Sequence, residues 1–312
     1  MIEALISAIK QVVRDIIEKA WVNSTASGQF SLQYAVSQVD STIYLFGGRV
    51  GVSTTGRSTC YKYSNNAFTA IASLPTTLVA ACSAVVGRKI YIFGGAGAIT
   101  AGTESKKVYI YDIDANSFTT GTDMPVNCVV GSCAAVGTDI YVYGGMNSMT
   151  ETGFPKLFYK YDTVAKTWTS LPYHDGQAML STNILNMGGL LYAFGGEYAN
   201  AGSNENDVRV FDPVAVSWSK PTVSGTKPQV RGACAMIKYD ETRFIIQGGR
   251  SGSGTNVLAD AWVFDIVSRV WTALPSLTKL AFHRGGLVAN NDVIVFDGYN
   301  GTNTTTLAYR LQ

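Results

Sequence analysis

Short runs of apolar residues that alternate around aromatic side chains recur along most of the chain, and each run ends in a pair of glycines. The runs are IYLFGG, IYIFGG, IYVYGG, LYAFGG and FIIQGG, ending at Gly48, Gly95, Gly145, Gly196 and Gly249. A degenerate sixth copy, VIVFDG, ends at Gly298, and successive copies lie 47 to 53 residues apart. A sustained period of this length indicates a repeat architecture.

Two further landmarks follow each glycine run in a constant order. A Tyr or Phe closes a second alternating run at Tyr63, Tyr111, Tyr161, Phe211, Phe264 and Tyr309. A second aromatic residue comes five or seven residues later in the first five copies, at Phe68, Phe118, Trp168, Trp218 and Trp271. A period of two indicates β-strands, and the Asp that usually follows the Tyr or Phe favours a tight turn. With the small-residue run before each glycine run, each copy predicts four short antiparallel strands.

Six such units predict an all-β fold, a six-bladed β-propeller with four-stranded antiparallel blades, because short antiparallel sheets in series close radially. The sixth copy ends at Gln312, too early for its fourth strand. Trp21 precedes Gly47 by 26 residues, the same offset that separates Phe68 from Gly94. We therefore predict that an N-terminal strand, at about residues 20–26, supplies the missing strand and closes the ring.

The glycine pairs, the Tyr or Phe and the Trp or Phe, in this order over residues 20–312, resemble those of the Kelch-repeat family. The resemblance implies a propeller that binds its ligands at one face, around a central channel. The loops at that face follow the glycine pairs or precede the inner strands. A fold of this kind hosts many functions, so the resemblance does not by itself specify one.

Residues 1–19 have a helical rather than a strand pattern and form a separate unit, with the propeller at 20–312. Apolar side chains recur at steps of three and four residues, among them Ile2, Leu5, Ile9, Val12 and Ile16. This spacing predicts one amphipathic α-helix. The helix could pack on its own propeller, mediate self-association or docking on a partner, or lie on a membrane surface. Charges of both signs on its polar face argue against the membrane.

Composition excludes several functional classes. Only 15% of the residues are charged and the net charge is +2, so the basic footprint of a nucleic-acid binder is missing. No apolar stretch is long enough for a transmembrane helix. Glu3, Lys10 and Arg14 interrupt the apolar run that a signal peptide requires. We therefore expect a cytoplasmic or virion-associated protein.

The five cysteines include no CxxC pair, and the chain has two histidines. We accordingly expect no metal site, no cofactor and no disulfide framework. Cys82, Cys133 and Cys234 lie in similar small-residue contexts, which favours thiols that pack as small apolar side chains.

Charged and polar residues at the expected loop positions are the candidate binding residues. They are Arg231, Arg284, Arg250, Glu197, Arg49, His283, His174 and Tyr299. Arg231 and Arg284 precede their inner strands at similar positions, and converging arginines would suit a carboxylate or an acidic peptide. The alternative interpretation is that these are solvated loop charges or structural residues.

These observations favour a non-catalytic binding or assembly module that holds a protein or glycan ligand at the loop face. The helix would mediate self-association or anchoring to a larger assembly, such as a virion or surface adhesion protein. One alternative is a sugar enzyme similar to sialic-acid mutarotases, suggested by Glu197 after a glycine pair, although residues 198–207 lack the arginine expected there. The other is a substrate-recognition propeller of an intracellular adaptor, although no BTB domain precedes the ring.

Overall fold

The computed structural model describes residues 33–50, 53–65, 67–150, 154–174, 177–198, 205–251 and 256–276. It also describes the backbone of four strands at 21–27, 286–289, 292–299 and 304–311. Within these residues every regular element is a strand, and none is helical. The helix predicted for residues 1–19 lies outside the described residues.

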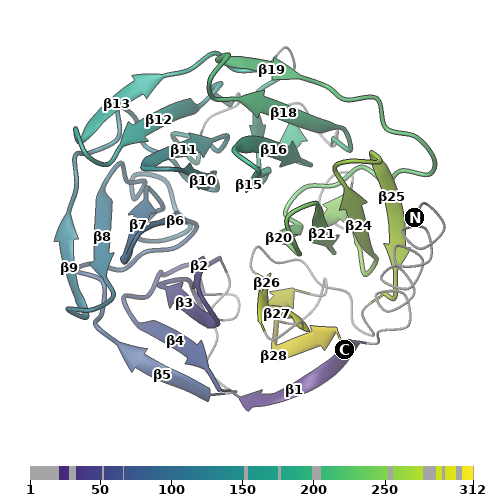
Figure 1. Ribbon diagram of the computed structural model, residues 1–312. Helices are drawn as coiled ribbons and strands as arrows, with labels where there is room; N and C mark the ends of the chain where they lie inside the picture. Colours follow the sequence, from purple (N-terminus) through teal and green to yellow (C-terminus); the bar gives the residue numbers. More distant parts are fainter. Residues whose placement is uncertain are drawn as a thin grey trace.

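Five four-stranded antiparallel sheets, whose strands come in sequence order, follow one another around the ring (Figure 1). The first two contain β2 (Ala35–Val39), β3 (Thr42–Phe46), β4 (Cys60–Ser64) and β5 (Ala67–Ile71), then β6 (Cys82–Val86), β7 (Lys89–Phe93), β8 (Val108–Asp112) and β9 (Ser117–Thr120). The third contains β10 (Ser132–Val136), β11 (Asp139–Tyr143), β12 (Phe158–Asp162) and β13 (Thr167–Ser170). The fourth contains β15 (Asn183–Met187), β16 (Leu190–Phe194), β18 (Val208–Asp212) and β19 (Ser217–Ser219). The fifth contains β20 (Ala235–Lys238), β21 (Arg243–Gln247), β24 (Ala261–Asp265) and β25 (Val270–Leu274).

A further four-stranded sheet joins the two ends of the chain. Its strand order is β1-β28-β27-β26, with β1 at Trp21–Ser27, β26 at Gly286–Ala289, β27 at Asp292–Tyr299 and β28 at Thr304–Leu311. Trp21 pairs with Leu311 in the antiparallel register between β1 and β28. The N-terminal strand therefore supplies the outer strand of the last sheet, as its aromatic spacing predicts. The all-β propeller of antiparallel sheets is confirmed.

The glycine pairs lie where the connection that enters the next sheet comes close to the backbone. Gly94 has a φ of +63°, and a Cβ atom there would overlap the carbonyl oxygen of Cys128. The adjacent Gly95 donates its N–H to that same oxygen at 2.7 Å. Only glycine combines a positive φ with such an approach. The repeated pair is therefore an inter-sheet contact as well as a bend.

The aromatic landmarks fill the space between neighbouring sheets. Phe93 on β7 lies with its ring centroid 6.0 Å from that of Tyr161 and 5.7 Å from that of Trp168, both on the next sheet. Edge-to-face pairs of this kind add to the energy of apolar burial. Gln247 occupies the equivalent position on β21. It is fully buried, and neither polar atom of its side chain has a hydrogen-bond partner among the described residues.

The turns between the third and fourth strands follow the predicted aspartate chemistry. Asp162 accepts hydrogen bonds through Oδ1 from the backbone N–H groups of Val164, at 2.9 Å, and Ala165, at 2.8 Å. These bonds lower the pKa of Asp162 below its usual value. The short side chain therefore fixes the turn by satisfying its backbone donors.

Two tryptophans each form a hydrogen bond between their own sheet and the connection that precedes it. The Trp168 indole Nε1 donates to the Thr122 carbonyl at 3.0 Å, and that of Trp218 donates to the Pro172 carbonyl at 2.9 Å. We expect Trp168→Phe to lower the free energy of unfolding by about 1 kcal/mol, because it removes one hydrogen bond and retains an aromatic ring. Urea unfolding would measure this, with Trp218→Phe as the equivalent change one sheet further on. An unchanged midpoint in both variants would show that these bonds contribute nothing to stability.

Candidate functional site

Long connections lie on one face of the ring, which we call the loop face. They follow the second strand of each sheet at residues 47–59, 94–107, 144–157, 195–207 and 248–260. The turns that join the first and second strands on the opposite face are much shorter, for example 87–88 and 137–138. On the loop face the long loops also bond to the connections that enter the next sheet, as where the Leu78 N–H donates to the Arg57 carbonyl at 2.9 Å. The loop face therefore carries the long connections, and backbone hydrogen bonds hold these connections against the neighbouring ones.

A chain of backbone hydrogen bonds borders the channel mouth on the loop face. The N–H of Ala80 donates to the Gln33 carbonyl, that of Val130 to Ala80, that of Ser181 to Val130 and that of Ala233 to Ser181, at 2.7 to 3.3 Å. All five residues have φ between +52° and +64°. Such a conformation is costly for residues other than glycine, so the repeated bonds hold the mouth in a defined shape.

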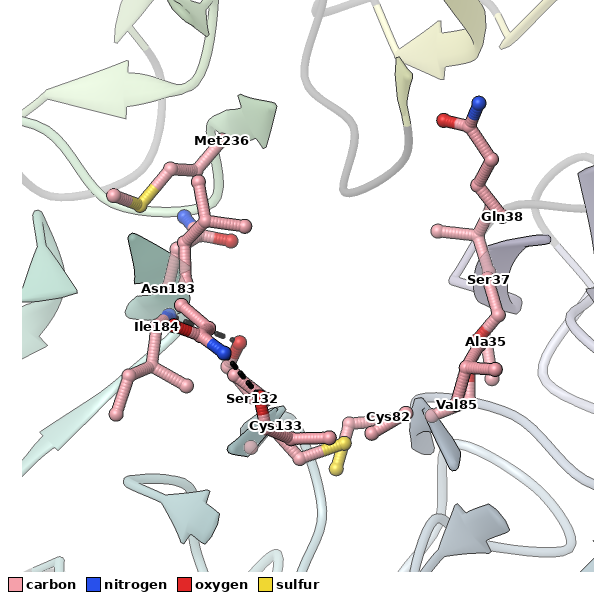
Figure 2. A pocket seen from close by; sticks show the side chains of 18 of the residues that line it. Ala35, Ser37, Gln38, Cys82, Val85, Ser132, Cys133, Asn183, Ile184 and Met236 are labelled. Carbon is pink, nitrogen blue, oxygen red and sulfur yellow. Dashed lines mark hydrogen bonds between the residues drawn. The ribbon is translucent and has the colours of Figure 1, made fainter. Parts of the chain in front are cut away.

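The inner strands enclose a central channel with a cavity of about 360 Å³. Figure 2 shows side chains from β2, β6, β10, β15 and β20 around it. Polar groups on the lining bond from one sheet to the next: the Ile184 N–H donates to Ser132 Oγ at 3.1 Å, and Asn183 Nδ2 donates to the Cys234 carbonyl at 3.0 Å. Among the described lining residues Lys238 alone is charged, and it pairs with Glu241 at 2.9 Å. The channel is therefore mostly neutral and rich in hydrogen-bonding groups.

Glu197 and Arg250 meet on the loop face where the fourth and fifth sheets adjoin. Glu197 lies in β17 (Glu197–Tyr198), which pairs with β14 (Met179–Leu180), and Arg250 lies in β22 (Arg250–Ser251), which pairs with β23 (Asn256–Val257). Arg250 Nε donates to Glu197 Oε1 at 2.7 Å, and Nη2 donates to Oε2. The Arg250 side chain is 30% exposed and that of Glu197 is 14% exposed. This fork-shaped pair is the accessible part of the predicted cluster.

Comparison with protein families agrees with this architecture. A family model for the KLHDC2/KLHL20/DRC7 Kelch-repeats domain matches residues 11–179 and 80–298. The two matches overlap and together span most of the chain. The chain belongs to the Kelch-repeat family.

Three curated proteins with unrelated names are similar to part of this Kelch protein. Putative protein tag-53 of Caenorhabditis elegans is 25% identical over 127 residues, which are 36% of this chain and 9% of the relative. Acyl-CoA-binding domain-containing protein 4 of Arabidopsis thaliana is 31% identical over 120 residues, or 36% and 17% of the two chains. N-(sulfonatooxy)prop-2-enimidothioate sulfolyase of Thlaspi arvense is 32% identical over 141 residues, or 42% and 39%. The similarity thus spans 9–39% of these relatives' lengths.

Arg231 of the Kelch ring points away from solvent. It is fully buried, and its guanidinium donates to both carboxylate oxygens of Asp260, at 2.8 and 2.7 Å. It also donates to the carbonyls of Gln229 and Gly248. Burial would raise the pKa of Asp260, but the hydrogen bonds and charge of Arg231 outweigh it and hold that pKa below its usual value. Arg231 therefore braces the loop face beside Arg250 and presents no guanidinium to solvent.

Arg49 and Arg57 lie in the first long loop of the Kelch ring. Their backbones adjoin, since the Arg57 N–H donates to the Gly48 carbonyl at 2.8 Å. Arg49 Nε donates to Gln33 Oε1 at 2.8 Å, which places it at the channel mouth, and burial lowers the pKa of its guanidinium. Arg57 Nη1 is buried without a hydrogen-bond partner in the described part of the chain. None of the ion pairs of the described residues involves either arginine.

His174 is part of the packing between the third and fourth sheets. It is 3% exposed, and its ring centroid lies 4.3 Å from that of Tyr173 and 5.8 Å from that of Trp218. Arg284 and His283 lie outside the described residues. For Tyr299 the structure describes only the backbone, at the end of β27.

Sequence reasoning missed a second charged cluster in the fourth long loop. Glu205 is buried and accepts hydrogen bonds from the Tyr198 hydroxyl and from Arg209 Nη2, the latter at 3.3 Å. Burial and the adjacent Glu205 raise the pKa of Tyr198 above its usual value. The available signal was Arg209 itself, which interrupts the run VRVFD where the second and third copies have Tyr109 and Tyr159.

The described residues include neither a metal-binding group nor a membrane-spanning helix. No group of three His, Cys, Asp or Glu side chains is arranged there to hold a metal ion. The described part of the chain also holds no helix with the length and apolar character needed to span a membrane.

Proposed function

We propose that this Kelch propeller is a non-catalytic binding module whose loop face holds a partner protein through an acidic segment. Support comes chiefly from Arg49 and Arg57, two arginines of one loop that form no ion pair with a described carboxylate. Arg49 lies at the channel mouth, and Arg57 Nη1 has no hydrogen-bond partner among the described residues. Other loop-face arginines are already compensated, Arg231 by Asp260 and Arg250 by Glu197. Uncompensated guanidiniums favour a carboxylate, which they bind through charge-assisted hydrogen bonds.

The Glu197–Arg250 pair offers a second contact on the same face. It is fork-shaped and partly exposed, so it can accept one hydrogen-bond donor and donate to one acceptor of the partner. The predicted role in a virion or in adhesion, and self-association through residues 1–19, draw no support from the described residues or from the relatives. They are not part of this proposal.

A selection from a displayed library of random peptides would test this function. We expect enriched peptides to carry carboxylates and the double variant Arg49→Ala/Arg57→Ala to bind them at least about tenfold more weakly. A charge-assisted hydrogen bond contributes about 1.5–3 kcal/mol, and 1.4 kcal/mol is tenfold in affinity. Fluorescence anisotropy with a labelled peptide would give the affinity.

Arg88 provides the matched control. It is an arginine on the opposite face, in the turn after β6, and its side chain pairs with Asp114. Arg88→Ala should leave affinity unchanged, and thermal melting should show that all variants are folded. Selection of uncharged peptides, or equal affinity in the Arg49→Ala/Arg57→Ala variant, would contradict the proposal.

A further inference from the structure

Two thiols line the channel on neighbouring sheets. Cys82 is the first residue of β6 and Cys133 the second residue of β10, and both line the channel cavity. Cys133 packs against the apolar cluster that contains Cys82. Neither takes part in a disulfide in the structure. Cys82 is 8% exposed, and Cys133 is half-buried.

The register of the ring places these residues opposite one another. Val130 donates its N–H to the Ala80 carbonyl, and Ser181 repeats this contact with Val130 one sheet later. Cys82 lies two residues after the anchor Ala80, and Cys133 lies three residues after the anchor Val130. Ser132 and Ile184 lie two and three residues after their anchors, Val130 and Ser181. The two pairs are therefore equivalent in register. In that second pair the Ile184 N–H donates to Ser132 Oγ at 3.1 Å. The side chain of the first residue therefore reaches the backbone of the second.

The direction of the side chains is equally regular. Ser132, the first residue of its inner strand, points towards the following sheet. Ser83, the second residue of its strand, points back to the preceding sheet, where its hydroxyl lies 2.8 Å from that of Ser37, the third residue of β2. Cys82 is a first residue and Cys133 a second residue, so their side chains are directed into the same seam. In Figure 2 the two thiols lie towards one another at the wall of the channel.

We propose that Cys82 and Cys133 form a reversible disulfide across this seam when the channel admits a peroxide. Disulfides join Cα atoms about 4.4–6.8 Å apart, and in the equivalent pair the contact of Ser132 Oγ with the Ile184 N–H brings the two residues close enough for such a separation. The bond would cross-link the second sheet to the third at the channel wall. It would also change the lining from two thiol donors to a group with none.

The step balances with hydrogen peroxide as the oxidant. The more exposed Cys133, as thiolate, attacks one peroxide oxygen; the O–O bond breaks, water leaves and a sulfenic acid forms. Cys82 then attacks the sulfenic sulfur, the S–S bond forms and a second water leaves. Overall two thiols and one peroxide give one disulfide and two waters. A small dithiol reductant reverses the bond by thiol–disulfide exchange.

The other cysteines are poorly placed for this chemistry. Cys128 and Cys234 are 1% and 0% exposed. Burial raises the pKa of Cys60 to about 11, which keeps it in the unreactive thiol form. Access to the channel therefore selects Cys82 and Cys133 from the five cysteines of the chain.

Thiol titration of the full chain tests the assignment. The reduced protein should show five thiols in denaturant, the number in the sequence, and three after brief treatment with hydrogen peroxide. Peptide mapping without reductant should recover Cys82 joined to Cys133, and dithiothreitol should restore five thiols. Because mapping uses the unaltered protein, it does not depend on any variant folding.

Single variants assign the two roles. Cys82→Ser should trap the sulfenic acid on Cys133, detected as a dimedone adduct that the unaltered chain does not give. The matched control is Cys128→Ser, a buried thiol of the same cluster, which should still lose two of its four thiols to the disulfide. Five thiols after peroxide, a disulfide between other cysteines, or one between two chains would each overturn the proposal.

Discussion

Removal of residues 1–27, which include β1, is expected to lower the melting temperature by about 10 °C or more. Without β1 the last sheet loses its outer strand and β28 gains an unpaired edge, since β1 pairs with β28 in the described structure. The first and last parts of the chain also lose the strand pairing that joins them. A cost of about 3–5 kcal/mol corresponds to such a shift at roughly 2–4 °C per kcal/mol.

The control for this truncation removes only residues 1–19. That shorter deletion leaves β1 intact, so the difference in melting temperature between the two truncations isolates the contribution of the closing strand. Differential scanning calorimetry would measure both. Equal melting temperatures would show that the β1–β28 pairing does not stabilise the ring.

Gly94→Ala is expected to lower the free energy of unfolding by about 2–5 kcal/mol. Its φ of +63° would strain an L-residue by about 1–2 kcal/mol. The new methyl group would also overlap the Cys128 carbonyl oxygen in the connection that enters the neighbouring sheet, and relief of such overpacking costs about 1–3 kcal/mol. Urea unfolding followed by tryptophan fluorescence would measure the sum.

Gly137→Ala separates these two costs. Gly137 has nearly the same φ, +60°, but no heavy atom would lie within 4 Å of its added Cβ. Only the backbone strain of about 1–2 kcal/mol should remain. If both variants lost the same stability, the glycine pair would be a conformational requirement and not the inter-sheet contact described above.

Most of the fold was predictable because the sequence repeats one structural unit. Each copy carries the same local signals, so the glycine pairs, the aromatic landmarks and the turn aspartates reinforce one another. Even the closing strand could be placed, from the offset between Trp21 and Gly47. Gln247 is the exception: the same position that packs aromatic rings in other sheets holds a buried amide, and no local pattern explains it.

The candidate binding residues were chosen from their loop positions alone, and their role in binding stays a prediction. Loop position predicted only that Glu197, Arg231 and Arg250 lie on one face of the ring. It could not show that Arg231 turns inward to Asp260 while Arg250 stays at the surface. Arg57 was not among the predicted residues because it lies well after its glycine pair in the sequence. Only the folding of the loop brings its backbone N–H to the Gly48 carbonyl.

The sequence alone therefore determined the repeat, its strands and the order of the sheets, because these depend on local periodicity and on contacts that recur at one fixed spacing. The tertiary structure decided which arginines are compensated, which cysteines face one seam and which face carries the elaborate loops. Those properties depend on side chains that meet across different sheets. Their pairing is set by the geometry of the ring, which positions residues some fifty places apart within hydrogen-bond distance, as for Glu197 and Arg250.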